Sequence, residues 1–345
     1  MLYTILLLVF GVQFFIPQLF AFPIPDLYTG FSKLNLPVPG PFGPDSVSRD
    51  PNNQGPYVGV SDGRILKYNG TDFVDFAYLS PNRSKQLCDG VTNLSLGPVC
   101  GRPLGFSFDP IFGYLYIVGA YGGFYRVGPQ GGQATLLATS ANGVTFNFLN
   151  GCEFDKLRRV VYFTDASLVY NFTDASLGIP APPGDSSGRL LEYNTVTGEV
   201  RELLRNIPRP GGPAVSSDSS FIVYGSFTTQ KVYKYYLIGP KAGASEVLIN
   251  SLLGFPVKIK RAPEFGLFWG TANVIVQQQP RLTNGYGYKF NSQGDIIILK
   301  NFTAEYGNAQ INVVQEYSDV IQGATLYVGS RSRSVNYVGV YTKWR

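Results

Sequence analysis

The chain of 345 residues contains no histidine. This absence excludes Ser-His-Asp and Cys-His catalytic groups, histidine general bases and most zinc sites. Any acid–base chemistry would have to be carried by Asp, Glu, Lys, Tyr or Cys side chains.

Charge is also scarce, since charged residues make up 15% of the chain and the formal net charge is +5. The densest basic group is Lys258, Lys260 and Arg261. A run this short predicts a solvated turn rather than a nucleic-acid surface, so we expect no nucleic acid partner.

Long apolar runs are missing except near the start of the chain. Residues 5–12 are apolar but too few to span a bilayer, and Pro17 follows soon after. This layout predicts a secretory signal peptide over residues 1–21, with an uncleaved anchor as the alternative. Residues 22–345 hold no run of membrane-spanning length, so we expect a single domain there and no membrane span after cleavage.

Cysteine is rare, with three in the chain. An oxidising lumen would join Cys88 and Cys100 in a disulfide, with two free thiols as the alternative. Cys152 lies in a strand-like context, which favours a buried inert thiol over a nucleophile.

Five Asn-x-Ser/Thr sequons predict N-glycosylation, at Asn69, Asn82, Asn93, Asn171 and Asn301.

What the chain does contain is a repeated pattern of short aromatic strands. An aromatic-rich strand ends in small residues and is followed by a second strand carrying tyrosine or phenylalanine. By subtraction of their positions, successive copies lie 46 to 60 residues apart, and they start at Tyr57, Tyr116, Tyr162, Ile222, Phe268 and Tyr327. Repeats of about 40 to 50 residues built from short strands are typical of propeller blades. The pattern therefore predicts an all-β, six-bladed β-propeller with ring closure between the terminal segments and a binding site at one mouth of its central channel.

Several segments resemble one plant family, the strictosidine synthase and strictosidine-synthase-like proteins. The similarity runs in order over roughly residues 36 to 341, and its clearest segments are SDGRILKYNG at 61–70, CGRPLGFSFD at 100–109, VVYFTDAS at 160–167 and SGRLLEYNTVTGEV at 187–200. The resemblance implies a six-bladed propeller of plant specialised metabolism that enters the secretory pathway, with the vacuole lumen or the extracellular space as its destination. It also implies a disulfide between Cys88 and Cys100.

The family's name-giving enzyme joins an arylethylamine to an aldehyde in a Pictet-Spengler condensation of alkaloid biosynthesis, and one glutamate moves the protons. In this chain the resemblance places Asn312 at that position, and an amide neither accepts nor releases a proton at ordinary pH. Glu316 is a candidate acid nearby, with a solvated or salt-bridged carboxylate as the alternative. The ligand pocket that the resemblance implies is formed by Leu104, Phe148, Asn150, Arg209, Phe227, Gln310 and Asn312. Arg209 would favour an anion or a carbonyl oxygen over an ammonium group, unless it is an exposed loop residue.

The wider six-bladed superfamily includes calcium-dependent lactonases and phosphotriesterases, and calcium requires at least six oxygen ligands. Asp45 and Asn150 could supply two of them, although both could instead be turn residues. Gly151 and Gly212 stand where two further ligands are expected, so no cofactor is expected and calcium is the only candidate.

Three functions remain open. The first is an enzyme acting on a small molecule at the propeller mouth by hydrolysis or condensation. The second is a non-catalytic propeller that binds a small ligand. The third is a secreted interaction protein that uses the loops at residues 82–99 and 171–186. We expect a monomer.

Overall fold

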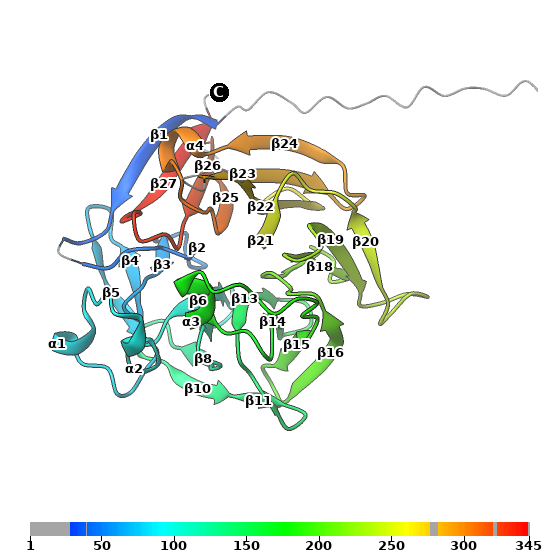
Figure 1. The fold of residues 1–345 in the computed structure, drawn as a ribbon, viewed down its shortest axis with the longest axis horizontal. Coiled ribbons are helices and arrows are strands. Elements are labelled where there is room, and N and C mark those ends of the chain that lie inside the picture. The colour runs from blue at the N-terminus through cyan, green and yellow to red at the C-terminus, as the bar shows by residue number, and fades with distance from the viewer. Residues whose placement is uncertain (1–27, 39, 277–281, 320–322, 344–345) are drawn as a thin grey trace, which may run out of the picture.

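The computed structural model describes residues 28–38, 40–276, 282–319 and 323–343. The signal peptide predicted for residues 1–21 lies outside these ranges. Six antiparallel sheets surround a common axis, as Figure 1 shows. The prediction of an all-β, six-bladed propeller is confirmed.

The first three blades follow one another along the chain. Blade 1 contains β2 (Ser46–Ser48), β3 (Tyr57–Gly59), β4 (Arg64–Tyr68) and β5 (Phe73–Tyr78); blade 2 contains β6 (Pro103–Phe108), β7 (Leu115–Gly119), β8 (Phe124–Val127) and β10 (Thr135–Ala138); blade 3 contains β13 (Leu149–Asp155), β14 (Val160–Asp165), β15 (Gly188–Asn194) and β16 (Val200–Ile207). In addition, β9 (Gly132–Gln133) pairs with β5, and β11 (Ser140–Ala141) pairs with β12 (Val144–Thr145).

The last three blades complete the ring. Blade 4 contains β17 (Ala214–Val215), β18 (Phe221–Ser226), β19 (Lys231–Tyr236) and β20 (Ser245–Ile249); blade 5 contains β21 (Phe255–Arg261), β22 (Leu267–Val276), β23 (Leu282–Asn291) and β24 (Ile296–Asn301); blade 6 contains β25 (Val313–Asp319), β26 (Gly323–Gly329), β27 (Tyr337–Lys343) and β1 (Tyr28–Asn35). The short helices are α1 (Lys85–Cys88), η1 (Leu94–Leu96), α2 (Gly97–Cys100), α3 (Phe172–Leu177) and α4 (Thr303–Tyr306).

Each repeat start identified in the sequence lies in the second strand of a blade. These strands are apolar on both faces because each blade packs between two neighbours. In β14, Val161 and Phe163 contact blade 2, whereas Val160 and Tyr162 contact blade 4. Alternate side chains of a strand point to opposite faces, so one strand contributes to two inter-blade cores. Phe163 stacks on Phe124 of blade 2 with 4.8 Å between ring centroids.

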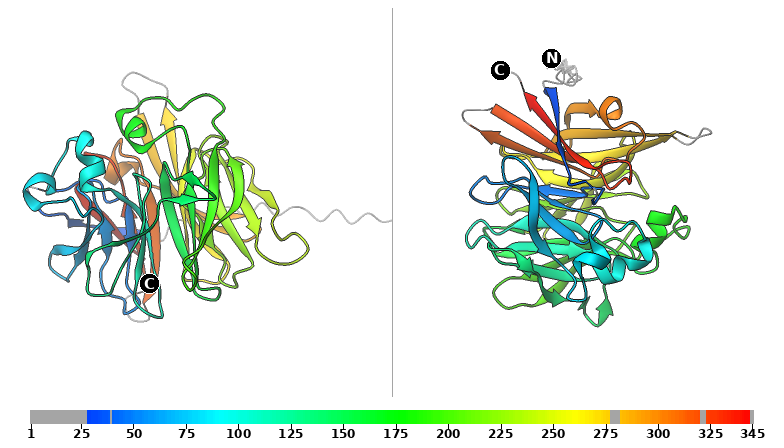
Figure 2. Two further views of the ribbon diagram at one scale, coloured as in Figure 1. Left: turned by 90° about the horizontal axis from the view of Figure 1, so that it is seen from below. Right: turned by 90° about the vertical axis from the view of Figure 1, so that its left-hand side faces the viewer.

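The ring closes through the two ends of the described chain. β1 pairs antiparallel with β27, with Phe31 opposite Tyr341, and Figure 2 shows the two strands side by side. The N-terminal strand thus completes a blade whose other strands come from the C-terminus, as predicted. Pairing of this edge removes a free strand that would otherwise invite association.

Candidate functional site

Two lysines of β21 fill the channel between the innermost strands. Lys258 Nζ lies 2.9 Å from Asp45 Oδ2 and donates a hydrogen bond to the backbone oxygen of the same residue at 3.0 Å. Lys260 Nζ lies 3.2 Å from Glu153 Oε2 and donates to the Cys152 carbonyl at 3.1 Å. Asp45 precedes blade 1 and Glu153 belongs to blade 3, so both lysines reach across the channel from blade 5.

This placement shows that the prediction of a solvated turn at Lys258–Arg261 was wrong. Lys258 and Lys260 are 2% and 5% exposed, and Ile259 between them is buried in the core between blades 4 and 5. The strand alternation sends both ammonium groups to the channel and the isoleucine to the core. Asp45 and Glu153, which are far from the lysines in the sequence, pair with the two ammonium groups and offset the cost of burying them.

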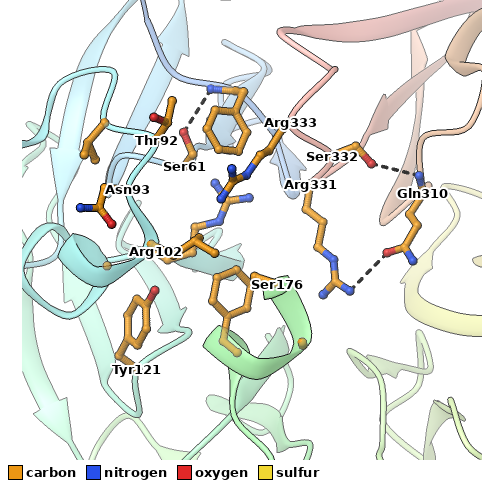
Figure 3. Close-up of a pocket in the computed structure, with 16 residues that line it drawn as sticks. Ser61, Thr92, Asn93, Arg102, Tyr121, Ser176, Gln310, Arg331, Ser332 and Arg333 are labelled. Atoms are coloured by element: carbon orange, nitrogen blue, oxygen red, sulfur yellow. Dashed lines mark hydrogen bonds between the residues drawn. The ribbon is translucent and has the colours of Figure 1, made fainter. Parts of the chain in front are cut away.

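A pocket of about 240 Å³ opens where the innermost strands begin, and we call this end of the channel the first mouth. Figure 3 shows side chains that enter it from several blades. Arg102 precedes β6, Tyr121 follows β7, and Arg331 and Arg333 lie in the loop between β26 and β27. The other lining residues are Phe42, Ser61, Val91, Thr92, Asn93, Leu94, Gly97, Phe172, Ala175, Ser176, Gln310 and Ser332.

This lining is cationic and partly apolar. It contains three arginines and neither aspartate nor glutamate nor cysteine. Arg331 donates a hydrogen bond to Gln310 Oε1 at 3.2 Å, a neutral partner that leaves the guanidinium charge uncompensated. Burial raises the pKa of Tyr121, so its hydroxyl stays protonated near neutral pH.

A smaller hollow of about 40 Å³ adjoins this pocket and shares Ala175, Gln310 and Arg331 with it. It contains five of the seven residues predicted to line the ligand site, namely Phe148, Asn150, Arg209, Phe227 and Gln310. We call the two hollows together the first-mouth pocket.

Arg209 is part of this wall and not an exposed loop residue. Its guanidinium carbon lies 4.8 Å from the centre of the Tyr170 ring and 4.6 Å from that of Phe227. Both ring faces attract the cation. Burial lowers the pKa of Arg209.

The opposite end of the channel, where the innermost strands finish, has a second pocket of about 270 Å³. Its lining carries both signs of charge, including Lys260, Arg261 and Glu153. The Glu153 carboxylate pairs with Lys260 and lies 4.0 Å from Arg261. This end of the channel therefore has carboxylates beside its cations, unlike the first mouth.

Comparison with known proteins places the chain in one family. The strictosidine synthase family model matches residues 150–240. Strictosidine synthase from Catharanthus roseus is 34% identical over 304 residues, which cover 87% of this chain and 84% of the relative. The chain belongs to the strictosidine synthase family. The protein STRICTOSIDINE SYNTHASE-LIKE 3 from Arabidopsis thaliana is 44% identical over 231 residues, which cover 66% of this chain and 58% of that relative.

Solved structures extend the likeness of fold well beyond the family. A calcium-binding protein, regucalcin from Agrobacterium tumefaciens, superposes with a TM-score of 0.61 at 12% identity. The superposition covers 91% of this chain and 96% of that one. At this level of identity the likeness concerns the propeller alone.

In this strictosidine synthase family member, Asn312 and Leu104 are each 1% exposed. Neither lines the two hollows of the first-mouth pocket. Asn312 Oδ1 accepts a hydrogen bond from the backbone N–H of Arg331 at 2.9 Å. The amide thus holds the loop that carries Arg331 and Arg333 in place, one layer beneath the pocket surface.

Glu316 is buried between blades 5 and 6 and is 2% exposed. Its carboxylate lies 2.7 Å from Lys289 Nζ, accepts a hydrogen bond from Trp269 Nε1 at 2.7 Å and accepts another from the Tyr28 hydroxyl. Both oxygens are engaged, and the residue lines neither hollow at the first mouth. These contacts support the salt-bridged alternative for Glu316.

The residues present do not fit a calcium ion. Asp45 already binds the ammonium group of Lys258, which would repel a second cation. Asn150 lies in the small hollow, and Gly151 packs so closely on Gly212 that a Cβ added to it would lie 2.6 Å from the Gly212 Cα. Across the part of the chain that the structure describes, no group of three acidic, cysteine or histidine residues could hold a metal.

Cys88 and Cys100 form a disulfide, as the sequence predicted. The loop that it closes includes Val91, Leu94 and Gly97, which line the first-mouth pocket. The loops at residues 82–99 and 171–186 thus contribute pocket wall, from η1, α2 and α3. Cys152 is a buried free cysteine, and its burial raises the pKa of the thiol to about 12, which supports the inert alternative.

Sequence reasoning missed Arg102, Tyr121, Arg331 and Arg333 as pocket residues. Arg102 lies in the segment CGRPLGFSFD, and the two C-terminal arginines lie just after the last repeat start. A signal was therefore present, since loops that follow repeat starts meet at one mouth of a propeller.

Within the described ranges, no helix has the length and apolar character that a membrane crossing requires.

Proposed function

We propose that this member of the strictosidine synthase family binds a small organic molecule in the first-mouth pocket and does not carry out the Pictet-Spengler condensation. The observation that carries the proposal is the pocket lining, which contains three arginines and no carboxylate. Asn312, at the position that the resemblance assigns to the catalytic glutamate, supports it further, since its side chain is bonded to the backbone of Arg331.

Electrostatics argues against an amine substrate here. An arylethylamine is an ammonium ion near neutral pH and would be repelled by Arg102, Arg331 and Arg333. A condensation also needs a base that takes protons from the amine and later from the ring carbon. No carboxylate lines the pocket to perform this step.

Hydrolysis of a small ester or lactone is the second candidate. Guanidinium groups placed around a pocket stabilise the negative charge that develops on a carbonyl oxygen during attack. Arg102 and Arg331 provide such groups, and the protonated hydroxyl of Tyr121 is a further donor. The lining offers no ordinary base to activate water, and for this reason we rank binding first.

A screen of the purified mature chain distinguishes these functions. Thermal shift with a library of small acids, amides, amines and esters reports binding, because a ligand that binds only the folded state raises Tm. Turnover is followed in parallel by mass spectrometry with aryl esters and lactones, with and without a chelator. We expect shifts without turnover. Chelator-resistant hydrolysis would establish the second candidate, and the absence of both shifts and turnover would leave the third hypothesis, a secreted interaction protein.

We further propose that the protein is processed in the secretory pathway and resides in the vacuole lumen or outside the cell. Support comes from the disulfide and from the exposure of four sequon asparagines, Asn69, Asn82, Asn93 and Asn301. Asn171 is only partly exposed and caps α3 through its side chain. Expression in plant cells, amino-terminal sequencing and a glycosidase mobility shift test this proposal. An intact leader without glycans would contradict it.

A further inference from the structure

Arg102 is a buried cation without a counter-ion. The residue is 4% exposed, and one nitrogen, Nη2, donates to the Gly43 carbonyl at 2.8 Å. Its Nε and Nη1 atoms are buried and have no hydrogen-bond partner among the described residues. Asp45 attracts it electrostatically, but that carboxylate is paired with Lys258.

Leaving a guanidinium group in this state is costly. A buried charge is normally paired and fully hydrogen-bonded, because loss of water is otherwise uncompensated. Burial accordingly lowers the pKa of Arg102. The positive charge of Arg102 is therefore uncompensated in the wall of the pocket, and this favours an anionic ligand there.

Neighbouring side chains strengthen the positive potential. Arg331 and Arg333 form no ion pair with any carboxylate in the described ranges, and Arg333 is exposed at the rim. Figure 3 shows Arg102, Arg331 and Arg333 entering the pocket from two different segments. Several unpaired guanidinium groups around one hollow favour a ligand with negative charge.

The rest of the lining indicates what else the ligand carries. Ser61 and Ser332 each accept a backbone N–H through their hydroxyl oxygen, so the hydroxyl hydrogens can still be donated. Apolar surface faces the same space, from Phe42, Val91, Leu94 and Phe172. A volume of about 240 Å³ suits a ligand with one ring and a short chain.

From these contacts we infer that the ligand of the first-mouth pocket is a small organic acid, whose carboxylate pairs with Arg102 and Arg333 and whose apolar body contacts the apolar side chains of the lining. The inference rests on the proposed function, that the pocket binds a small molecule, and adds the chemical class of that molecule. Carboxylate is preferred to phosphate because apolar side chains lie beside the arginines in the same lining. Phenyl phosphate serves as a separate arm of the test.

Three matched probes test the charge directly: 3-phenylpropanoate, its isosteric amide 3-phenylpropanamide, and the cationic 3-phenylpropylamine. Titration calorimetry on the full mature protein measures each Kd at low and at high salt. We expect the acid to bind about tenfold or more tightly than the amide, the amine to bind most weakly, and the affinity for the acid to fall as salt rises. Tighter binding of phenyl phosphate than of the acid would overturn the carboxylate class.

Variants locate the binding. Arg333→Gln removes a charge at the exposed rim without disturbing the core, and we expect it to weaken the acid about threefold to tenfold while leaving the amide unchanged. Arg102→Met should weaken the acid more than Arg333→Gln does and bring its affinity closer to that for the amide. Arg205→Gln is the matched control, since Arg205 lies on β16 with its side chain 68% exposed, and its Kd values should equal those of the parent.

The outcomes separate the two proposals. Equal affinity for acid and amide would overturn the ligand class and leave the pocket as a small-molecule site. An unchanged Kd for the acid in Arg333→Gln and Arg102→Met would also overturn it, because binding would lie elsewhere. If Arg102→Met does not fold, the Arg333→Gln result decides. Absence of binding by all probes and by the wider screen would overturn both proposals.

Discussion

Lys258 and Asp45 form a buried ion pair that joins blade 5 to blade 1 across the propeller axis, with 2.9 Å between Nζ and Oδ2. The Lys258 ammonium group thus balances the Asp45 carboxylate. Gly212 leaves space for the lysine side chain, and Gly151 leaves space for Gly212. Gly212 lies against the lysine side chain, since a Cβ added there would be 2.9 Å from Lys258 Cγ.

Removing one partner of this pair should destabilise the protein. Lys258→Met leaves the Asp45 carboxylate buried and unpaired, and we expect a loss of about 3–5 kcal/mol in the free energy of unfolding. The double variant Lys258→Met with Asp45→Asn should recover most of it. Urea unfolding measures both. A single variant as stable as the parent would show that the pair does not hold the channel together.

Glu316→Gln should affect stability and not ligand binding. The amide would lose charge next to Lys289 and place an NH₂ group where the carboxylate now accepts donors from Trp269 and Tyr28. We expect a loss of about 3 kcal/mol, at the lower end of the range for a broken buried pair, because Glu264 still pairs with Lys289. Glu199→Gln at an exposed turn is the control. If the variant is fully folded and its affinity for pocket ligands is nevertheless altered, Glu316 would be connected with the first-mouth pocket.

Cys152 should be unreactive in the folded protein. Burial raises its pKa to about 12 from an ordinary value of 9.0, so at pH 8.5 alkylation by iodoacetamide should be slower than in urea by roughly a thousandfold. Because the folded-state pKa is the higher one, the stabilisation linked to this group is present below pH 9 and is lost as the pH rises through about 12. Mass spectrometry of the native protein checks the rate. Fast labelling without unfolding would contradict the inert assignment.

Loss of the disulfide should weaken both stability and the pocket. Cys88 and Cys100 are separated by 12 residues, and a loop of this size corresponds to about 3 kcal/mol in the chain-entropy model. The double variant Cys88→Ser with Cys100→Ser should therefore lose about that amount. Its affinity for pocket ligands should fall as well, since the closed loop carries Val91, Leu94 and Gly97. Unchanged affinity would show that the wall keeps its shape without the bridge.

The fold could be predicted because the repeats carry their own signal. Each second strand must be apolar on both faces to pack between two blades, as in Val160–Asp165, and this requirement leaves the same short pattern in every blade. Blade number, ring closure and the mouth as a site all follow from that local pattern.

The site was predicted only in part because its partners are distant in the sequence. Five predicted residues do line the small hollow, but the unpaired state of Arg102 depends on Lys258 taking Asp45, 213 residues away. Local sequence gives no indication of such a pairing. For the same reason Lys258 and Lys260 resembled a solvated turn, although the alternation with Ile259 marks a strand with one charged and one apolar face.

The most direct test of the proposed function is a condensation assay on the parent protein. The mature chain and its Asn312→Glu variant are expressed in a secretory host and incubated with tryptamine or dopamine and several aldehydes, and the products are followed by mass. We predict no product from the parent, because its pocket is cationic and lacks a base. Product from Asn312→Glu alone would show a condensation site disabled at one residue, whereas turnover by the parent would contradict our reading of the first-mouth pocket.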